Sequence, residues 1–292
     1  MNWKVFSEKA LTTPCEVAYR TTGFSWSADY SLTLNEAESN ADVGGWVTID
    51  NNSGKKYVNA KLKLIAGDVN TVNQNVGYLA YARGAVGGSA NSFSEKSFAD
   101  YHLYTLSRPV TLNESSQKQV EFIPKVFNIP VDKYHEVRIG AGGYNEQKIT
   151  ARNFVKFLNS EKNGLGIAFP KGTVRVFKED KADGSLEFIG EDSINHTPRD
   201  ENLTINTGNA FDLVSDKIAN SRTSTDNKGG YRADVTMKVT NHKDIKADVV
   251  VIFSNGYSDN LKLRMKPSAP VPEKVSASEY RWRKTLAANE VW

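Results

Sequence analysis

Short segments in which apolar and polar residues alternate dominate this sequence, and that two-residue period constrains the fold more than any other feature. Residues 26–33 and 45–50 show it first, and the second of these runs into Asn-Asn-Ser-Gly at 51–54, a turn-forming group. Further segments of this kind cover residues 61–65, 101–110, 120–127, 153–158, 172–178, 185–189, 202–206, 231–240, 247–253 and 261–265. Convincing amphipathic helices are absent from the sequence between them. The pattern therefore predicts an all-β protein of antiparallel β-sandwich-like domains and argues against a parallel α/β sheet.

The chain length of 292 residues allows one large or two ordinary domains, and we expect two. We place an N-terminal β-sandwich-like domain at residues 1–135 and a C-terminal one at residues 150–292. The Gly-rich residues 140–143 lie between them and are interpreted as a turn or connector, because no helix follows that could hold a dinucleotide phosphate. Within the second domain, Asp183-Gly184 is the strongest hairpin signal of the sequence.

A long loop is expected inside the first domain, at about residues 70–99. This stretch is rich in small and polar residues and has no periodicity, whereas alternation starts abruptly at Tyr101. We predict a surface excursion that proteases cut first. The aromatic residues Tyr78, Tyr81 and Phe93 support a second hypothesis, in which the loop docks onto a partner subunit.

Composition excludes several classes of protein. The 37 basic and 34 acidic residues leave a net charge of +3, so no global electrostatic attraction to nucleic acid is expected. No apolar run approaches the roughly 18 residues of a membrane-spanning helix, so no transmembrane segment is expected. The single Cys15 cannot form an internal disulfide.

Several blocks of sequence resemble the mucoidy-inhibitor-type family, whose conserved C-terminal domain has no established function. The blocks are residues 23–30, 45–55, 59–70, 159–167, 172–180, 188–192, 196–198 and 208–212, which occur in order over almost the whole chain. The resemblance implies a mainly bacterial, exported protein, secreted or located in the periplasm or at the cell surface. It also implies that full-length relatives carry a leader and a coiled-coil-bearing region, both missing here, and continue into one more strand after residue 290. The family supplies no catalytic residue.

Candidate catalytic groups are sparse. The four histidines are far apart and lack metal-ligand spacing, so we predict no metal site and no cofactor. Glu191, Asp192 and Asp200 bracket His196, and paired carboxylates can perform glycosidic acid-base chemistry when their separation is suitable. These four residues are the weak candidates for a hydrolase, and a structural role is the alternative for each.

Aromatic residues offer a candidate binding site. Trp26, Tyr30 and Trp46 have the size and the amphipathic edges of sugar-stacking side chains, and Tyr78 and Tyr81 join them as candidates in the loop. Packing inside the first sandwich is the alternative for Trp26, Tyr30 and Trp46.

The C-terminal domain carries a signal for self-association. If a final strand is missing, a neighbouring strand has unpaired backbone groups, and an open edge recruits another strand. Tyr280, Trp282 and Trp292 add apolar surface near that end, and the excess of Lys and Arg over residues 262–284 could either meet an anionic partner or protect an exposed sheet.

The sequence thus predicts a binding or structural/assembly module of the cell envelope or exterior, with a polysaccharide or protein partner. A hydrolase acting on envelope or extracellular polysaccharide is the alternative. A cleft in which His196 meets carboxylates would favour the enzyme, and an aromatic face or a sheet edge would favour binding.

Overall fold

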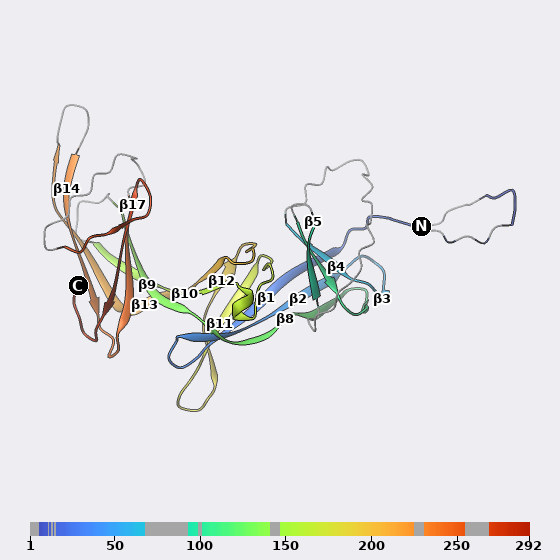
Figure 1. The fold of residues 1–292 in the computed structure, drawn as a ribbon, viewed down its shortest axis with the longest axis horizontal. Coiled ribbons are helices and arrows are strands. Elements are labelled where there is room, and N and C mark those ends of the chain that lie inside the picture. Colours follow the sequence, from blue (N-terminus) through green and yellow to red (C-terminus); the bar gives the residue numbers. More distant parts are fainter. Residues whose placement is uncertain are drawn as a thin grey trace.

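The protein is all-β. The computed structural model describes residues 6–10, 12, 14, 16–67, 93–98, 101–140, 147–224, 231–254 and 269–292, and the positions discussed above at Cys15, Tyr78, Tyr81 and residues 261–265 lie outside these ranges. Within them, strands account for every regular element except one 3₁₀ turn, Glu161–Asn163. None of the described helical segments is long and apolar enough to cross a membrane. Figure 1 shows an elongated molecule with its largest sheets side by side along the long axis.

A five-stranded sheet lies in the middle of the molecule (Figure 1). Its strands, in spatial order, are β12 (Leu186–Ile194), β11 (Gly172–Glu179), β1 (Phe24–Leu34), β2 (Asn40–Asn51) and β8 (Ser116–Pro130). The β1 and β11 strands run parallel, which corrects the purely antiparallel sheets expected from the sequence. Turn residues specify antiparallel neighbours joined by a hairpin, whereas nothing local sets the direction of two strands so distant in the chain.

A seven-stranded sheet forms the C-terminal end of the molecule. Its order is β14 (Tyr231–Asn241), β13 (Asn202–Ser224), β10 (Gln147–Leu158), β9 (Asp132–Gly140), β15 (Ala247–Ser254), β17 (Glu279–Leu286) and β16 (Glu273–Lys274). Its one parallel pair, β9 with β15, is a second correction of the antiparallel prediction. The last residue, Trp292, exchanges backbone hydrogen bonds with Val239, so the chain end covers part of the β14 edge.

Two small sheets complete the opposite end of the molecule (Figure 1). One pairs β3 (Tyr57–Ala60) with β7 (Val110–Leu112), and the other has the order β4 (Lys63–Ala66), β6 (Tyr101–Leu106) and β5 (Phe93–Phe98). The β5 strand falls in the segment that the sequence predicts as loop, so that prediction is wrong for residues 93–98. The rest of the expected loop, residues 70–92 and 99, lies outside the described residues.

Two hydrophobic cores lie along the chain. The first fills the inner face of the five-stranded sheet, and the second fills one side of the seven-stranded sheet. Strands β10 and β13 pass through both, because Val155 and Leu203 belong to the first core whereas Ala151 and Leu213 belong to the second.

Both large sheets take strands from the two sides of residues 135–150, where the sequence analysis places the domain boundary. Strands β9 and β10 on either side of that point are neighbours in one sheet. Strands β11 and β12 follow it in sequence but pair with β1 in the other sheet. Their hairpin turn is confirmed, since the Gly184 amide donates to Asp180 O and Gly184 has the positive φ of 74° that glycine tolerates.

Candidate functional site

The five-stranded sheet has one buried and one solvent-facing side, and the solvent-facing side is called the outer face here. Along β1, Tyr30 and Leu32 point into the first core, whereas the alternating residues Asp29 and Ser31 are only half buried. Successive side chains of a strand point to opposite sides, so this alternation assigns every residue of β1 to a face. The cross-strand register extends the assignment to β2, where Trp46 pairs with Asp29.

Trp46 lies on the outer face of β2, on the same side of the strand as Gly44. Its ring atom Cη2 is 3.6 Å from the position that a Cβ of Gly44 would take, and Ser31 Oγ is 3.6 Å from the same position. The Trp46 ring therefore approaches the Gly44 backbone to van der Waals distance on the same face as the Ser31 hydroxyl. With 36% of its surface exposed, Trp46 presents a large aromatic ring to solvent.

Charged side chains of the neighbouring strands lie on both sides of the Trp46 ring. Arg175 Nη1 is 3.0 Å from Asp29 Oδ1, and Arg175 Nε is 3.3 Å from Glu191 Oε2. On the other side of Trp46, Glu121 of β8 is its register partner. Trp46 in β2 and Glu191 in β12 are three strand steps apart, about 14 Å at the usual strand spacing. From β8 to β12, four strand steps or about 19 Å, the outer face carries Trp46, the Arg175 guanidinium and the carboxylates of Asp29, Glu121 and Glu191. The Lys125–Asp42 ion pair lies next to Gly44 on the same face.

The other two aromatic candidates face the core. Tyr30 is 2% exposed and donates its hydroxyl to Pro170 O at 2.9 Å. Its ring fills the space above two glycines, because a Cβ on Gly45 would lie 2.8 Å from Tyr30 Cδ1 and one on Gly172 would lie 3.1 Å from Tyr30 Cε2. Trp26 shares the inner face and packs against the first core. Tyr30 and Trp26 therefore pack against the core, and Trp46 is the most exposed of the three aromatic residues.

The four catalytic candidates make separate contacts. Glu191 pairs with Arg175 on the outer face, whereas the Asp192 carboxylate accepts the Asn206 and Ser193 amides. His196 Nδ1 accepts the Lys171 amide at 3.2 Å, and the Asp200 amide donates to Asn159 O. The contacts found for them do not bring the four side chains into one cleft.

A carboxylate and an imidazole that the sequence analysis did not connect lie together on the small sheet of β4, β5 and β6. His102 Nδ1 is 2.7 Å from Glu95 Oε1, and the Ala168 amide donates to Glu95 Oε2 at 2.9 Å. The Glu95 side chain is only 4% exposed, whereas that of His102 is 37% exposed. The sequence concealed this pair because Glu95 lies in the segment read as loop.

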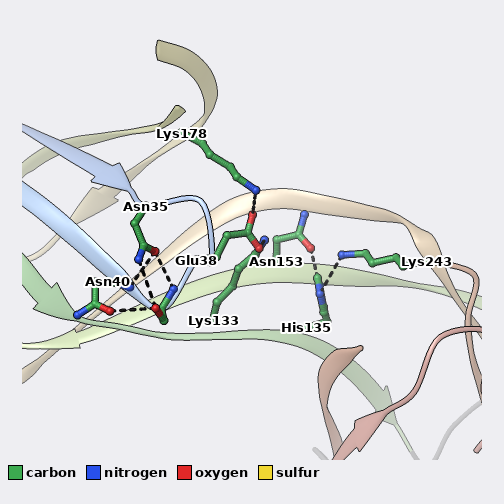
Figure 2. A network of polar contacts seen from close by, with 9 residues as sticks. Asn35, Glu38, Asn40, Lys133, His135, Asn153, Lys178 and Lys243 are labelled. Atoms are coloured by element: carbon green, nitrogen blue, oxygen red, sulfur yellow. Dashed lines mark hydrogen bonds and ion pairs between the residues drawn. The ribbon is translucent and has the colours of Figure 1, made fainter. Parts of the chain in front are cut away.

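A second polar cluster joins the two cores, and we call it the junction network. It consists of Glu38, Lys133, His135, Asn153, Lys178 and Lys243 (Figure 2). Glu38 adopts a positive φ of 55° in the β1–β2 turn, where its amide donates to Asn35 O. From there its carboxylate accepts Lys178 Nζ at 2.8 Å and also pairs with Lys133 of β9. Burial raises the Glu38 pKa, but the hydrogen bonds from the two lysines outweigh it and lower that pKa overall.

His135 is the buried centre of the other half of the junction network. Its Nδ1 lies 2.7 Å from Asn153 Oδ1, and Lys243 Nζ lies 3.2 Å from its Nε2. An amide oxygen needs a donor and an ammonium group needs an acceptor, so His135 is the neutral tautomer with its proton on Nδ1. Burial, followed by the charge on Lys243, lowers the pKa of His135 to about 4, which agrees with this neutral form.

Comparison with known proteins gives no relative for this fold or these sites: no family model, no curated protein and no solved structure matches the chain.

Proposed function

We propose that this protein is a binding module of the cell envelope or exterior whose outer face takes a polysaccharide. The observation that carries the proposal is Trp46, an exposed indole on the outer face next to Gly44, with hydrogen-bonding side chains on the neighbouring strands. Aromatic rings stack on the apolar faces of ligands, while a few polar groups around them fix orientation. The location follows from the resemblance to the mucoidy-inhibitor-type family and is part of the same proposal.

The charges of the outer face favour a neutral polysaccharide. Asp29, Glu121 and Glu191 are three carboxylates, and Arg175 is bound between two of them. Carboxylates accept hydrogen bonds from sugar hydroxyls and repel carboxylate or phosphate groups of an acidic polymer. Strand spacing gives the face room for more than one sugar unit across β2, β1, β11 and β12.

Two β-sandwich-like domains are the architecture that we propose for this module. The two separate cores support it, since each could form the interior of one sandwich. Because β10 and β13 contribute to both, we infer that the domains share strands and are not linked by a flexible connector.

Binding to immobilised polysaccharides tests the function. Soluble neutral glucans, mannans and xylans, and a polyuronate for comparison, are cast into native gels, and retardation of the protein is measured. We expect a neutral polymer to slow the protein, Trp46→Ala to abolish the effect and Trp46→Phe to retain part of it. Phe211→Ala is the matched control, because Phe211 is an exposed aromatic residue of the other large sheet. Equal retardation of wild type and Trp46→Ala by every polymer would refute the proposal.

A hydrolase is the second candidate, and the Glu95–His102 pair favours it. A carboxylate that holds one imidazole nitrogen leaves the other nitrogen able to accept a proton, which is how a general base is oriented. If the outer face delivers substrate to this base, polysaccharides that bind should also release reducing ends. His102→Gln should abolish that release and keep binding, whereas release that persists in His102→Gln would exclude the pair.

We also propose self-association through the C-terminal domain. The open strand edge available for it is shorter than the sequence suggests. The backbone of Val239 is already paired with Trp292, and Trp282 packs against the second core with its Nε1 donating to Pro270 O at 2.9 Å. The remaining edge of β14, residues 231–238, is the surface that we propose for strand addition. Light scattering over a concentration series should show dimers, and a monomer at all concentrations would contradict this part of the proposal.

A further inference from the structure

The junction network has more hydrogen-bond donors than acceptors. An ammonium group carries three donors and an asparagine amide carries two. Lys243 has one side-chain partner among the described residues, the neutral His135, and has no carboxylate within ion-pair distance there. Because Asn153 turns its oxygen toward His135, its amide nitrogen points the other way, and Figure 2 shows it on the side from which Lys178 reaches Glu38.

Charge is also unbalanced at this place. Lys133, Lys178 and Lys243 contribute three ammonium groups. The carboxylates that face them are Glu38, shared by Lys133 and Lys178, and the more distant Asp212, whose charge acts on Lys243. His135 adds no charge in its neutral form. Counted with Asp212, the described residues around the network have one positive charge in excess in a partly buried setting, where electrostatic attraction exceeds that at an open surface.

We propose that the junction network is a binding site for a phosphate-type oxyanion, held by Lys243 Nζ, the Asn153 amide and Lys178 Nζ. These three groups come from the β14–β15 turn, β10 and β11, so the anion would link strands that belong to different cores. Each group would donate hydrogens for which the described residues offer no acceptor, and charge-assisted bonds of this kind are the strong ones. The site is separate from the outer face and does not depend on the polysaccharide proposal.

The Lys243 ammonium group gives the site a pH dependence. Burial, followed by the charge on Lys133, lowers the pKa of Lys243, while Glu38 and Asp212 raise it and Lys178 lowers it slightly further. A bound anion favours the charged lysine, so binding should take up protons and weaken as the pH rises through the pKa of the free site.

Calorimetry with inorganic phosphate against sodium chloride of equal ionic strength tests the proposal. We expect saturable binding to wild type, at least tenfold weaker binding to Lys243→Gln, and unchanged binding to Lys181→Gln. Lys181 is the matched control because it is an exposed lysine whose ion pair is with Glu36. The second arm of the experiment uses a phosphodiester polymer, poly(glycerol phosphate), to identify the source of the anion. If the polymer binds as tightly as phosphate, the natural ligand is a phosphate group carried by a polymer. If phosphate alone binds, the ligand is the free ion.

Two results would overturn the proposal. One is the absence of saturable phosphate binding to the folded wild-type protein. The other is equal binding by wild type and Lys243→Gln. If Lys243→Gln does not fold, the side-chain amide resonances of Asn153 in the wild-type protein decide instead: they should shift during a phosphate titration, and unmoved resonances would exclude the site.

Discussion

The neutral, buried His135 makes the stability of the protein depend on pH. Its pKa is lowered from 6.5 to about 4 in the folded state, while the unfolded chain keeps the higher value. Below pH 6.5 the unfolded state therefore binds the additional proton, so the His135 contribution is fully present above pH 6.5 and is lost as the pH falls toward 4. The full loss is about 3 kcal/mol at 1.36 kcal/mol per unit, and about 2 kcal/mol of it falls between pH 7 and pH 4.5.

Urea denaturation at pH 7, 6, 5 and 4.5 measures this contribution. Carboxylates such as Glu38 also titrate in acid, so the quantity to follow is the difference in unfolding free energy between wild type and His135→Gln. As the pH falls from 7 to 4.5, we expect the wild type to lose about 2 kcal/mol of unfolding free energy relative to His135→Gln. His196→Gln is the matched control, because it removes an exposed imidazole. A difference independent of pH would refute the reasoning that His135 is buried in its neutral form.

Three further substitutions are expected to separate the packed from the exposed positions, each measured by the urea denaturation midpoint. Gly45→Ala places a Cβ 2.8 Å from Tyr30 Cδ1 and should cost about 1–3 kcal/mol, so a loss below about 0.5 kcal/mol would show that the ring can move aside. Tyr104→Phe removes the donor that Ala168 O accepts at 2.9 Å in a buried position, with an expected loss of about 1–3 kcal/mol, and an unchanged midpoint would contradict that bond. Phe211→Ser should change stability by less than about 0.5 kcal/mol because Phe211 is 95% exposed, and a large loss would mean that Phe211 is covered.

The sequence predicts the strands of this protein better than their partners. Alternation places the centres of β1, β2, β8 and β10 correctly, because the period depends only on which residues of a strand face a core. It misses β9, because the buried positions of that strand include the polar residues His135 and Glu136, whose partners Asn153 and Arg152 lie on β10. It also misses both parallel pairings, which join strands from distant parts of the chain.

The candidate site was predictable only in part, and Trp46 shows why. Alternation places Trp26 and Tyr30 on one face of β1, but it does not tell which face is buried. The answer depends on Gly45 and Gly172, which make room for the Tyr30 ring, and on β11, which arrives beside β1 from more than a hundred residues away. The junction network is harder still, because Glu38, His135 and Lys243 come together only through the arrangement of two cores.

The most direct test of the proposed function is the response of individual tryptophans to a ligand. The five indole N–H groups give separate nitrogen-15 resonances, which can be assigned by single Trp→Phe substitutions. During titration with oligosaccharides of the neutral polymer that retards the protein, the account predicts that the Trp46 resonance moves in a saturable manner. The resonances of Trp26 and Trp282, which pack against the two cores, should stay in place. A stationary Trp46 resonance at saturating ligand would contradict binding at the outer face.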